Sequence, residues 1–260
     1  MWPGQSQSEE DLPKLGEVRP RCASYRSFTR LSPNGHRQIA TDGYFDAVSS
    51  FVVRLWLPDR PGALGQVASR IGDAGGDVVG IEILERGGGS AIDELIVDLP
   101  ADVTVQTLVA EIGRVEGVAV EDVRQMDVDR QEAALAALEV AAILVETSAD
   151  ERLERFSEEL LRLVDGSWVA AIRVAPSGDH DVASLVTRGD PPDTAWLAAF
   201  LVGSRHLSSR VLGESTPSDV VWVHLDSLGV AVASGRSGRP FHTRERLQVS
   251  LLGRIADGLI

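Results

Sequence analysis

The sequence is poor in three things on which large classes of proteins depend: cysteine, long apolar runs and lysine. Cys22 is the only cysteine among 260 residues, which excludes internal disulfides and cysteine metal clusters and favours a reducing, cytoplasmic location. No stretch approaches the roughly 18 consecutive apolar residues of a membrane-spanning helix, so we expect no membrane association. The N-terminus carries Glu9, Glu10 and Asp11 in place of an apolar core, so it does not resemble a signal peptide.

Positive charge is scarce as well. Lys14 is the only lysine, and 25 Lys and Arg residues are outnumbered by 39 Asp and Glu residues, for a formal net charge of −14 at pH 7. Residues 49–127 and 128–260 are both acidic, whereas residues 1–48 are close to neutral. An acidic surface repels a phosphate backbone, so we expect no nucleic-acid partner.

Signatures of catalysis and metal binding are missing too. The sequence has no Gly-x-Ser-x-Gly elbow, no His-Glu-x-x-His motif and no dinucleotide-binding glycine fingerprint. Asp93 and Glu94 are neighbours in a predicted strand and point to opposite faces, so they are not a paired acid and base. His206 and His224 are not spaced like a metal pair. We therefore expect no enzymatic activity, no metal and no cofactor.

Residues 1–48 show neither helical nor strand periodicity and are rich in Ser, Pro, Gly, Arg and Gln. This composition predicts a disordered extension. Two interpretations remain: a passive extension, which the abrupt start of regular patterning at Phe51 favours, or a binding tail.

Residues 49–127 alternate between strand and helix periodicity in a compact order. The Gly-rich stretch Gly87–Gly89 lies between two strands and is interpreted as a hairpin tip, not a phosphate loop. The order strand, helix, strand, strand, helix, strand predicts a ferredoxin-like α+β fold with one antiparallel sheet and both helices on one face. The other face is left to water or to a partner. The predicted elements are Phe51–Leu57, Leu64–Ile71, Asp77–Leu84, Ile92–Leu99, Val105–Ile112 and Val118–Val123.

This segment resembles the ACT domain, a small regulatory module of amino-acid metabolism. The resemblance is carried by FVVRLWL, DRPGAL, GQVASRI, GGDVVGIEI and IDELIVDL, in that order from Phe51. It implies that an amino acid binds at the corner between the first strand and the first helix, at an interface between two modules. The start of the partner's second strand would supply the other side.

The corner has two interpretations. Asp59 or Arg60 could simply cap the helix, with Pro61 in its first turn. Alternatively, the helix N-terminus could hold a ligand carboxylate, Asp59 could meet an ammonium group, and Gly62 could allow close approach. The resemblance implies a site made of Asp59, Arg60, Pro61, Gly62, Ala63 and Leu64, with Asp77, Val78 and Val79 at the strand. Asp77 departs from the Asn that is frequent there, which alters the expected charge preference.

Residues 128–260 predict a second α+β domain, with two helices first, strands in the middle and a closing helix capped by Thr243. The segment Leu228–Leu259, with its Gly-Arg-Pro-Phe turn, resembles the end of a GAF domain. Its flanking helices are expected to form a dimer seam, and the last one carries Leu247, Leu251, Ile255 and Leu259 at a spacing of four residues.

The sequence therefore predicts a non-catalytic, homodimeric regulatory protein that binds an amino acid and acts on a separate partner enzyme. The alternative is a structural dimerisation protein that has no small-molecule ligand and acts by binding a partner enzyme or regulator.

Overall fold

The computed structural model describes residues 48–126, 133–174, 183–205 and 217–260. Both of its sheets belong to one compact unit, Asp46–Ile260. The extension predicted over residues 1–48 lies outside the described residues, apart from Val48, where the first strand begins.

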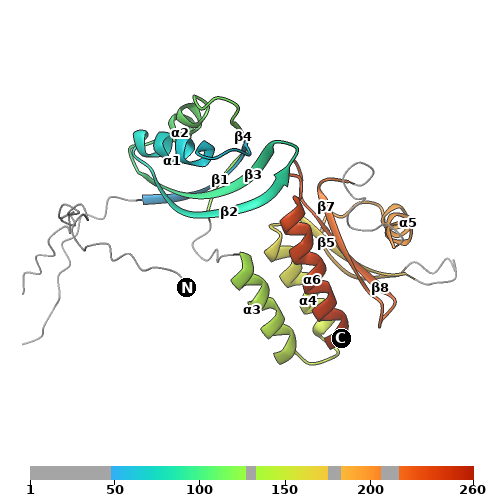
Figure 1. Ribbon diagram of the computed structural model, residues 1–260. Helices are drawn as coiled ribbons and strands as arrows, with labels where there is room; N and C mark the ends of the chain where they lie inside the picture. Colours follow the sequence, from blue (N-terminus) through green and yellow to red (C-terminus); the bar gives the residue numbers. More distant parts are fainter. Residues whose placement is uncertain (1–47, 127–132, 175–182, 206–216) are drawn as a thin grey trace, which may run out of the picture. The chain divides into compact units, whose positions relative to one another are not determined.

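The first part of this unit is a four-stranded antiparallel sheet in the order β2-β3-β1-β4 (Figure 1). This arrangement confirms the predicted α+β class and the order of its elements. The elements are β1 (Val48–Pro58), α1 (Ala63–Asp73), β2 (Asp77–Gly87), β3 (Ser90–Pro100), α2 (Val105–Ile112) and β4 (Ala119–Gln125).

Alternation along the strands determines which side of this sheet is covered. Val53 and Leu55 of β1 and Leu95 of β3 are fully buried, and they pack in one core with Val67 of α1 and Leu108 of α2. Both helices therefore lie on the same face of the sheet. The β2–β3 connection is the predicted hairpin: Gly88 and Gly89 have φ of 64° and 84°, as a tight two-residue hairpin turn requires.

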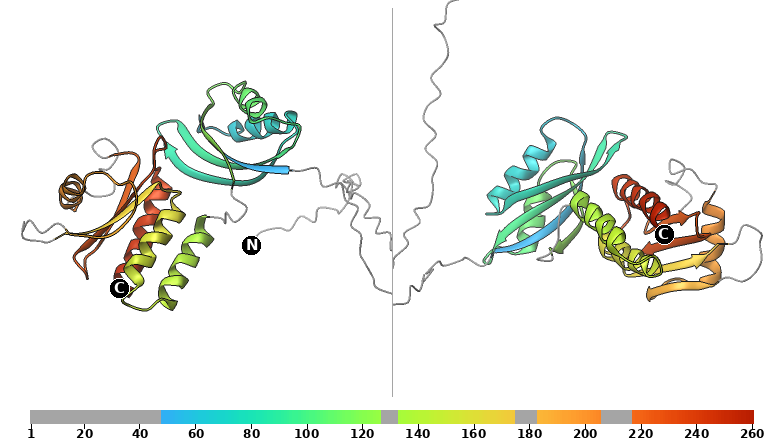
Figure 2. Two further views of the ribbon diagram at one scale, coloured as in Figure 1. Left: turned by 180° about the vertical axis from the view of Figure 1, so that it is seen from behind. Right: turned by 90° about the horizontal axis from the view of Figure 1, so that it is seen from below.

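The second part is another antiparallel sheet, in the order β6-β5-β8-β7. Helices α4 and α6 pack on one face of it, α3 packs against these two helices, and α5 packs on the other face (Figure 2). The elements are α3 (Ala133–Glu146), α4 (Arg152–Leu163), β5 (Trp168–Arg173), β6 (Ser184–Gly189), α5 (Thr194–Ser204), β7 (Val220–Leu225), β8 (Val230–Gly235) and α6 (Thr243–Leu259).

Helix α6 differs from the prediction in its N-cap residue, and its regular apolar stripe is largely exposed. Its N-cap is His242, not Thr243, because Glu245 reaches back to the His242 backbone N–H in a capping box. Leu247, Leu251 and Ile255 of the predicted stripe are 44–57% exposed, whereas its fourth residue, Leu259, is partly buried against the core, and Val249 on another face enters that core. The regular apolar stripe is thus an outer surface of this helix. Within the described residues, no helix meets the length and apolarity that a membrane span requires.

Candidate functional site

The chain turns from β1 into α1 through Asp59–Gly62. Gly62 is the N-cap of α1 and has φ of 86°, a left-handed conformation that glycine adopts with little strain. The backbone N–H of Asp59 donates to the carbonyl of Gly89 at 3.0 Å, which ties the turn to the β2–β3 hairpin.

The interpretation of Asp59 or Arg60 as the N-cap is wrong. The left-handed residue Gly62 turns the chain, so α1 begins only at Ala63 and no side chain caps it. Pro61 consequently precedes the helix instead of standing in its first turn. The carboxylate of Asp59 forms an ion pair with Arg86 of β2 instead.

A cavity of about 390 Å³ lies at this turn. Ligand pockets generally span roughly 300–1,000 Å³, so this one suits a small molecule. The predicted site residues Asp59, Arg60, Pro61, Gly62 and Leu64 line it. The remaining residue predicted for the loop, Ala63, is 1% exposed and belongs to the core.

A residue that the sequence analysis did not assign to the site, Asp93 of β3, also lines the cavity. It lies opposite Leu55 of β1 and Ile83 of β2, so its side chain is on the face that carries the helices. Asp93 is only 3% exposed, and its Oδ1 atom has no hydrogen-bond partner among the residues that the structure describes. One feature of the sequence could have identified Asp93: it is a carboxylate between Ala91 and Leu95, at a position where the strand alternation predicts a buried side chain.

Charges of both signs surround the cavity. Nη2 of Arg86, at the end of β2, lies 3.6 Å from Oδ1 of Asp59. Burial raises the pKa of the Asp93 carboxyl; Arg86 opposes this rise, and the carboxylate of Asp59 adds to it. The ionised form of Asp93 is therefore destabilised unless a further cation or hydrogen-bond donor reaches it.

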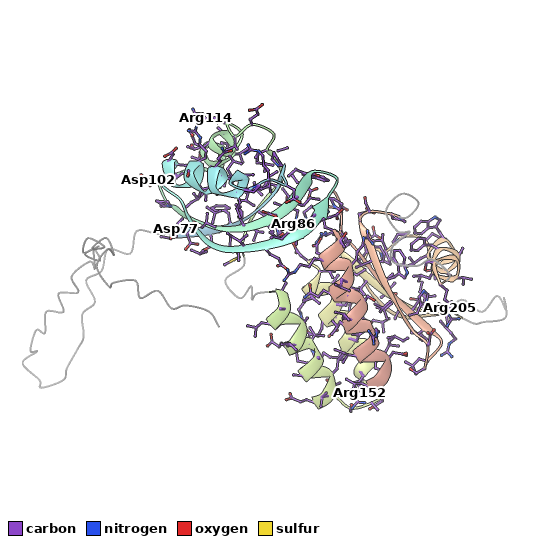
Figure 3. All side chains as sticks on the ribbon, in the orientation of Figure 1. Asp77, Arg86, Asp102, Arg114, Arg152 and Arg205 are labelled. Carbon is purple, nitrogen blue, oxygen red and sulfur yellow. The ribbon has the colours of Figure 1, made fainter. Side chains whose placement is uncertain are left out.

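Asp77, Val78 and Val79 are at the start of β2, whereas the cavity is lined by Ile83 and Arg86 towards the end of that strand. Figure 3 shows Asp77 and Arg86 well apart along β2. Within one chain, the structure does not bring the predicted strand residues to the predicted loop residues.

The turn, the cavity and the hairpin lie in one continuous stretch of the chain. Residues 51–117 match the family model of the ACT domain. The match indicates a regulatory, small-molecule-binding module, and we call these residues the ACT segment. The resemblance of residues 128–260 to a GAF domain finds no support in the comparisons and stays a prediction.

No curated protein matches the chain at a significant level. Among solved structures, an uncharacterized protein from Thermotoga maritima is similar over 31% of this chain and 100% of its own, with 19% identity and a TM-score of 0.25. A formyltetrahydrofolate deformylase from Pseudomonas putida KT2440 is similar over 41% of this chain and 39% of its own, with 13% identity and a TM-score of 0.26. An unknown protein from Galdieria sulphuraria is similar over 73% of this chain and 98% of its own, with 14% identity and a TM-score of 0.29. TM-scores this low do not establish a common fold.

The other face of the ACT segment's sheet carries a buried cluster of charges. Arg54 of β1 is 1% exposed, and its Nη2 lies 2.8 Å from Oε2 of Glu94 and 3.0 Å from Oε1 of Glu245 in α6. Glu245 also accepts a hydrogen bond from Nη2 of Arg236 at 2.8 Å. At Arg54 this face, which was expected to be left to water or to a partner, is covered by the start of α6.

The charges in this cluster stabilise one another. Burial by itself lowers the pKa of Arg54, but Glu245 and Glu94 outweigh it, so that the pKa is raised. Burial by itself raises the pKa of Glu245, but Arg236 and Arg54 outweigh it, so that the pKa is lowered. Each charged form therefore depends on its partners, as buried ion pairs do.

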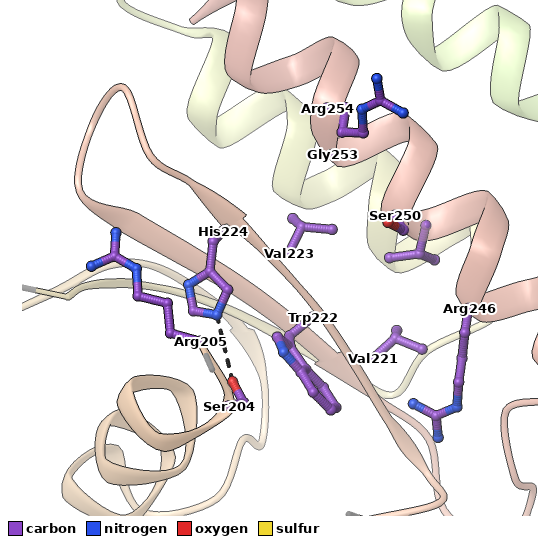
Figure 4. A pocket seen from close by; sticks show the side chains of 11 residues that line it. Ser204, Arg205, Val221, Trp222, Val223, His224, Arg246, Ser250, Gly253 and Arg254 are labelled. Atoms are coloured by element: carbon purple, nitrogen blue, oxygen red, sulfur yellow. Dashed lines mark hydrogen bonds between the residues drawn. The ribbon is translucent and has the colours of Figure 1, made fainter. Parts of the chain in front are cut away.

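A second cavity, of about 320 Å³, lies beside β7 and α6 (Figure 4). Arg205 already forms an ion pair, Arg246 donates to backbone carbonyls, and Nε2 of His224 lies 3.5 Å from Oγ of Ser204. Burial lowers the pKa of His224, which favours the neutral ring. Residues 206–216 follow directly after Arg205 and lie outside the described part of the chain, so we assign no ligand to this cavity.

Proposed function

We propose that this protein is a non-catalytic regulatory protein that binds an amino acid in the corner between β1 and α1. The observation that carries the proposal is the 390 Å³ cavity, in which Asp59, Arg60, Arg86 and the buried Asp93 gather around a small space. A zwitterionic amino acid is the simplest ligand for such a cavity, because its ammonium group can meet the carboxylates and its carboxylate can meet the arginines. The ACT match supports the regulatory role.

The structure also offers a route from the cavity to α6. Asp93 and Glu94 are consecutive in β3, and alternation sends the first side chain into the cavity and the second into the cluster with Arg54 and Glu245. We propose that ligand at Asp93 alters the position of β3 and thereby the start of α6. Such coupling requires two arrangements that the ligand binds with different affinity.

We also propose that the working form is a homodimer. β2 is an edge strand, and its Val79, Ile81 and Ile83 are 54%, 52% and 37% exposed. Exposed apolar strips on a sheet edge are suited to pairing with a second copy. Pairing along β2 would let the Asp77–Val79 segment of one copy complete the corner of the other.

The alternative function is dimerisation without a ligand. Helices α3 and α6, which are in contact, expose Leu138 (67%), Val145 (62%), Leu247 (57%) and Leu251 (47%). This surface favours a structural role in which partner binding, and not the corner, matters. In either case we propose that the protein is cytoplasmic and that its regulated partner is a separate enzyme. Its negative net charge disfavours binding to nucleic acid.

The first experiment is a thermal-shift panel of the full chain with each proteinogenic amino acid at millimolar concentration. A ligand at 100 times its dissociation constant stabilises the native state by about 2.7 kcal/mol, which is a readily measured shift. A shift with one amino acid or a few related ones supports the sensor. A flat panel contradicts it and leaves the dimerisation protein.

The route to α6 is tested by hydrogen exchange on the same complex. We expect ligand to change exchange in the first turns of α6, and Glu94→Gln to abolish that change while the ligand still binds. Glu116→Gln, at an exposed position, is the matched control. Equal changes in all three proteins would show that α6 does not respond through Glu94.

A further inference from the structure

The buried Asp93 has a carboxyl oxygen, Oδ1, with no hydrogen-bond partner within the described part of the chain. Its Oδ1 atom is inaccessible and makes no hydrogen bond, although the residue lines the cavity and is 3% exposed. A buried polar atom is nearly always hydrogen-bonded, and an unpaired buried charge is strongly destabilising. The atom therefore calls for a donor that the described residues do not provide.

The groups around Asp93 show which donor fits. Arg86 of β2 pairs with Asp59 at 3.6 Å and has a 62% exposed side chain, so it stands at the rim. Arg60 is exposed on the turn and lies 3.4 Å from Gln66. Both arginines of the cavity lining are therefore exposed, and Arg86 acts on the Asp93 carboxyl without forming a hydrogen bond to its Oδ1 atom in the described part of the chain.

The remaining walls are aliphatic. Leu57, Leu64, Ile83 and Ala91 line the cavity, together with Pro58 at the end of β1 and Pro61 of the turn. These walls would accept a branched alkyl chain and would leave a second buried polar group unsatisfied. The burial-raised pKa of Asp93 agrees with this environment.

We infer that Asp93 selects the ligand of the corner by its free ammonium group, and that the ligand class is small aliphatic α-amino acids. The ammonium group meets Asp93, the carboxylate faces Arg60 and Arg86, and the side chain packs on the aliphatic walls. This inference rests on the proposed function and names its substrate class. Asp93 becomes a specificity-determining residue that discriminates an amino acid from its deaminated analogue.

The test is calorimetry on the full chain with four probes: L-valine, L-leucine, 3-methyl-2-oxobutanoate and isobutylamine. The oxo acid has the carbon skeleton of valine without the amine, and isobutylamine has it without the carboxylate. We expect at least one of the two amino acids to bind, and the oxo acid to bind at least tenfold more weakly than valine. Asp93→Asn should weaken amino-acid and amine binding at least tenfold and leave any oxo-acid binding unchanged.

Two controls separate a binding role from a structural one. Asp102→Asn makes the same change at an exposed residue of the same segment that does not line the cavity, and it should leave all four affinities unchanged. Asp93→Asn should melt at the same temperature as the wild type or higher at pH 7, because it removes an unpaired buried charge. A large fall in melting temperature would assign Asp93 a structural role and overturn the inference.

The remaining outcomes distinguish this inference from the proposed function. Amino-acid binding that survives Asp93→Asn, or an oxo acid that binds as well as valine, overturns the role of Asp93 and leaves the amino-acid sensor standing. Binding of isobutylamine that Asp93→Asn removes, with neither valine nor leucine bound, supports the ammonium contact but overturns small aliphatic amino acids as the ligand class. If valine, leucine and isobutylamine all fail to bind, this inference fails, whereas the sensor fails only if the thermal-shift panel of all the amino acids is flat as well.

Discussion

Arg54 and Glu245, which are 191 residues apart in the chain, form an ion pair in which Nη2 and Oε1 are 3.0 Å apart. Their side chains are only 2% and 17% exposed. Glu245 also accepts from Arg236 and from the backbone N–H of His242, so one carboxylate joins β1, the end of β8 and the start of α6. Its removal leaves two buried arginines without that carboxylate.

We therefore expect Glu245→Gln to lower the free energy of unfolding by about 3 kcal/mol, because breaking a buried pair strands the remaining charges. Urea denaturation of the full chain measures this loss. Glu116→Gln changes the same group at an exposed position and should have little effect. A loss below about 1 kcal/mol, as for a surface pair, would contradict the description of the cluster as buried and cooperative.

The same cluster predicts acid sensitivity. The folded-state pKa of Glu245 lies below its ordinary value of 4.5. Its contribution to the free energy of unfolding is therefore complete above pH 4.5 and is lost as the pH falls through the lower, folded-state pKa. Unfolding free energies measured from pH 7 downwards should therefore fall more steeply below pH 4.5 in the wild type than in Glu245→Gln. Parallel curves would show that Glu245 does not titrate differently in the two states.

For Asp93 we expect the opposite dependence of stability on pH. Its folded-state pKa lies above the ordinary value of 3.8, so the unliganded protein loses stability as the pH rises from 3.8 through the folded value. Asp93→Asn should lack this loss. Binding of valine should weaken as the pH falls through the same range, because a protonated Asp93 no longer attracts an ammonium group. Calorimetry across pH, with the variant as control, measures both effects.

Gly62 allows bulk to be separated from backbone strain. At φ of 86°, any other L-residue is strained by roughly 1–2 kcal/mol, while a Cβ atom would meet nothing within 4 Å. Gly62→Ala and Gly62→Leu should therefore lose similar stability in thermal unfolding. Only the leucine variant should lose amino-acid binding, since its side chain can reach into the cavity. Equal binding by both variants would remove the neighbourhood of Gly62 from the site.

Two surfaces could hold the dimer together: the edge strand β2 and the exposed apolar stripe of α6. Ile81→Lys places a charge on the exposed edge strand β2, and Leu251→Glu places one on the exposed stripe of α6. Because both residues are about half exposed, neither change should unfold the chain. Sedimentation velocity should show that Ile81→Lys yields a monomer of 27.9 kDa and that Leu251→Glu remains a dimer. The reverse result would assign pairing to the helices and favour the structural role.

Local patterns predicted much of the ACT segment. Apolar alternation in β1 and β3 and the i, i+3, i+4 spacing in α1 depend on neighbouring residues only, so the element order was confirmed. The helix start was wrong because the left-handed backbone of Gly62, not a side chain, decides where α1 begins. The stripe of α6 was identified correctly as regular, but its exposure depends on which other face meets the sheet.

The βαββαβ order, the hairpin within Gly87–Gly89 and the Asp-Arg-Pro-Gly corner could all be predicted from the amino-acid sequence, because strand and helix periodicity and positive-φ turns are local properties of the chain. It took the folded structure to show that Asp93 lines the corner cavity, that its Oδ1 has no hydrogen-bond partner among the described residues, and that α6 covers Arg54. The reason is physical: burial and electrostatic pairing depend on which distant segments come together. A carboxylate in a strand looks the same in sequence whether it meets water, an arginine or an empty space that a ligand could fill.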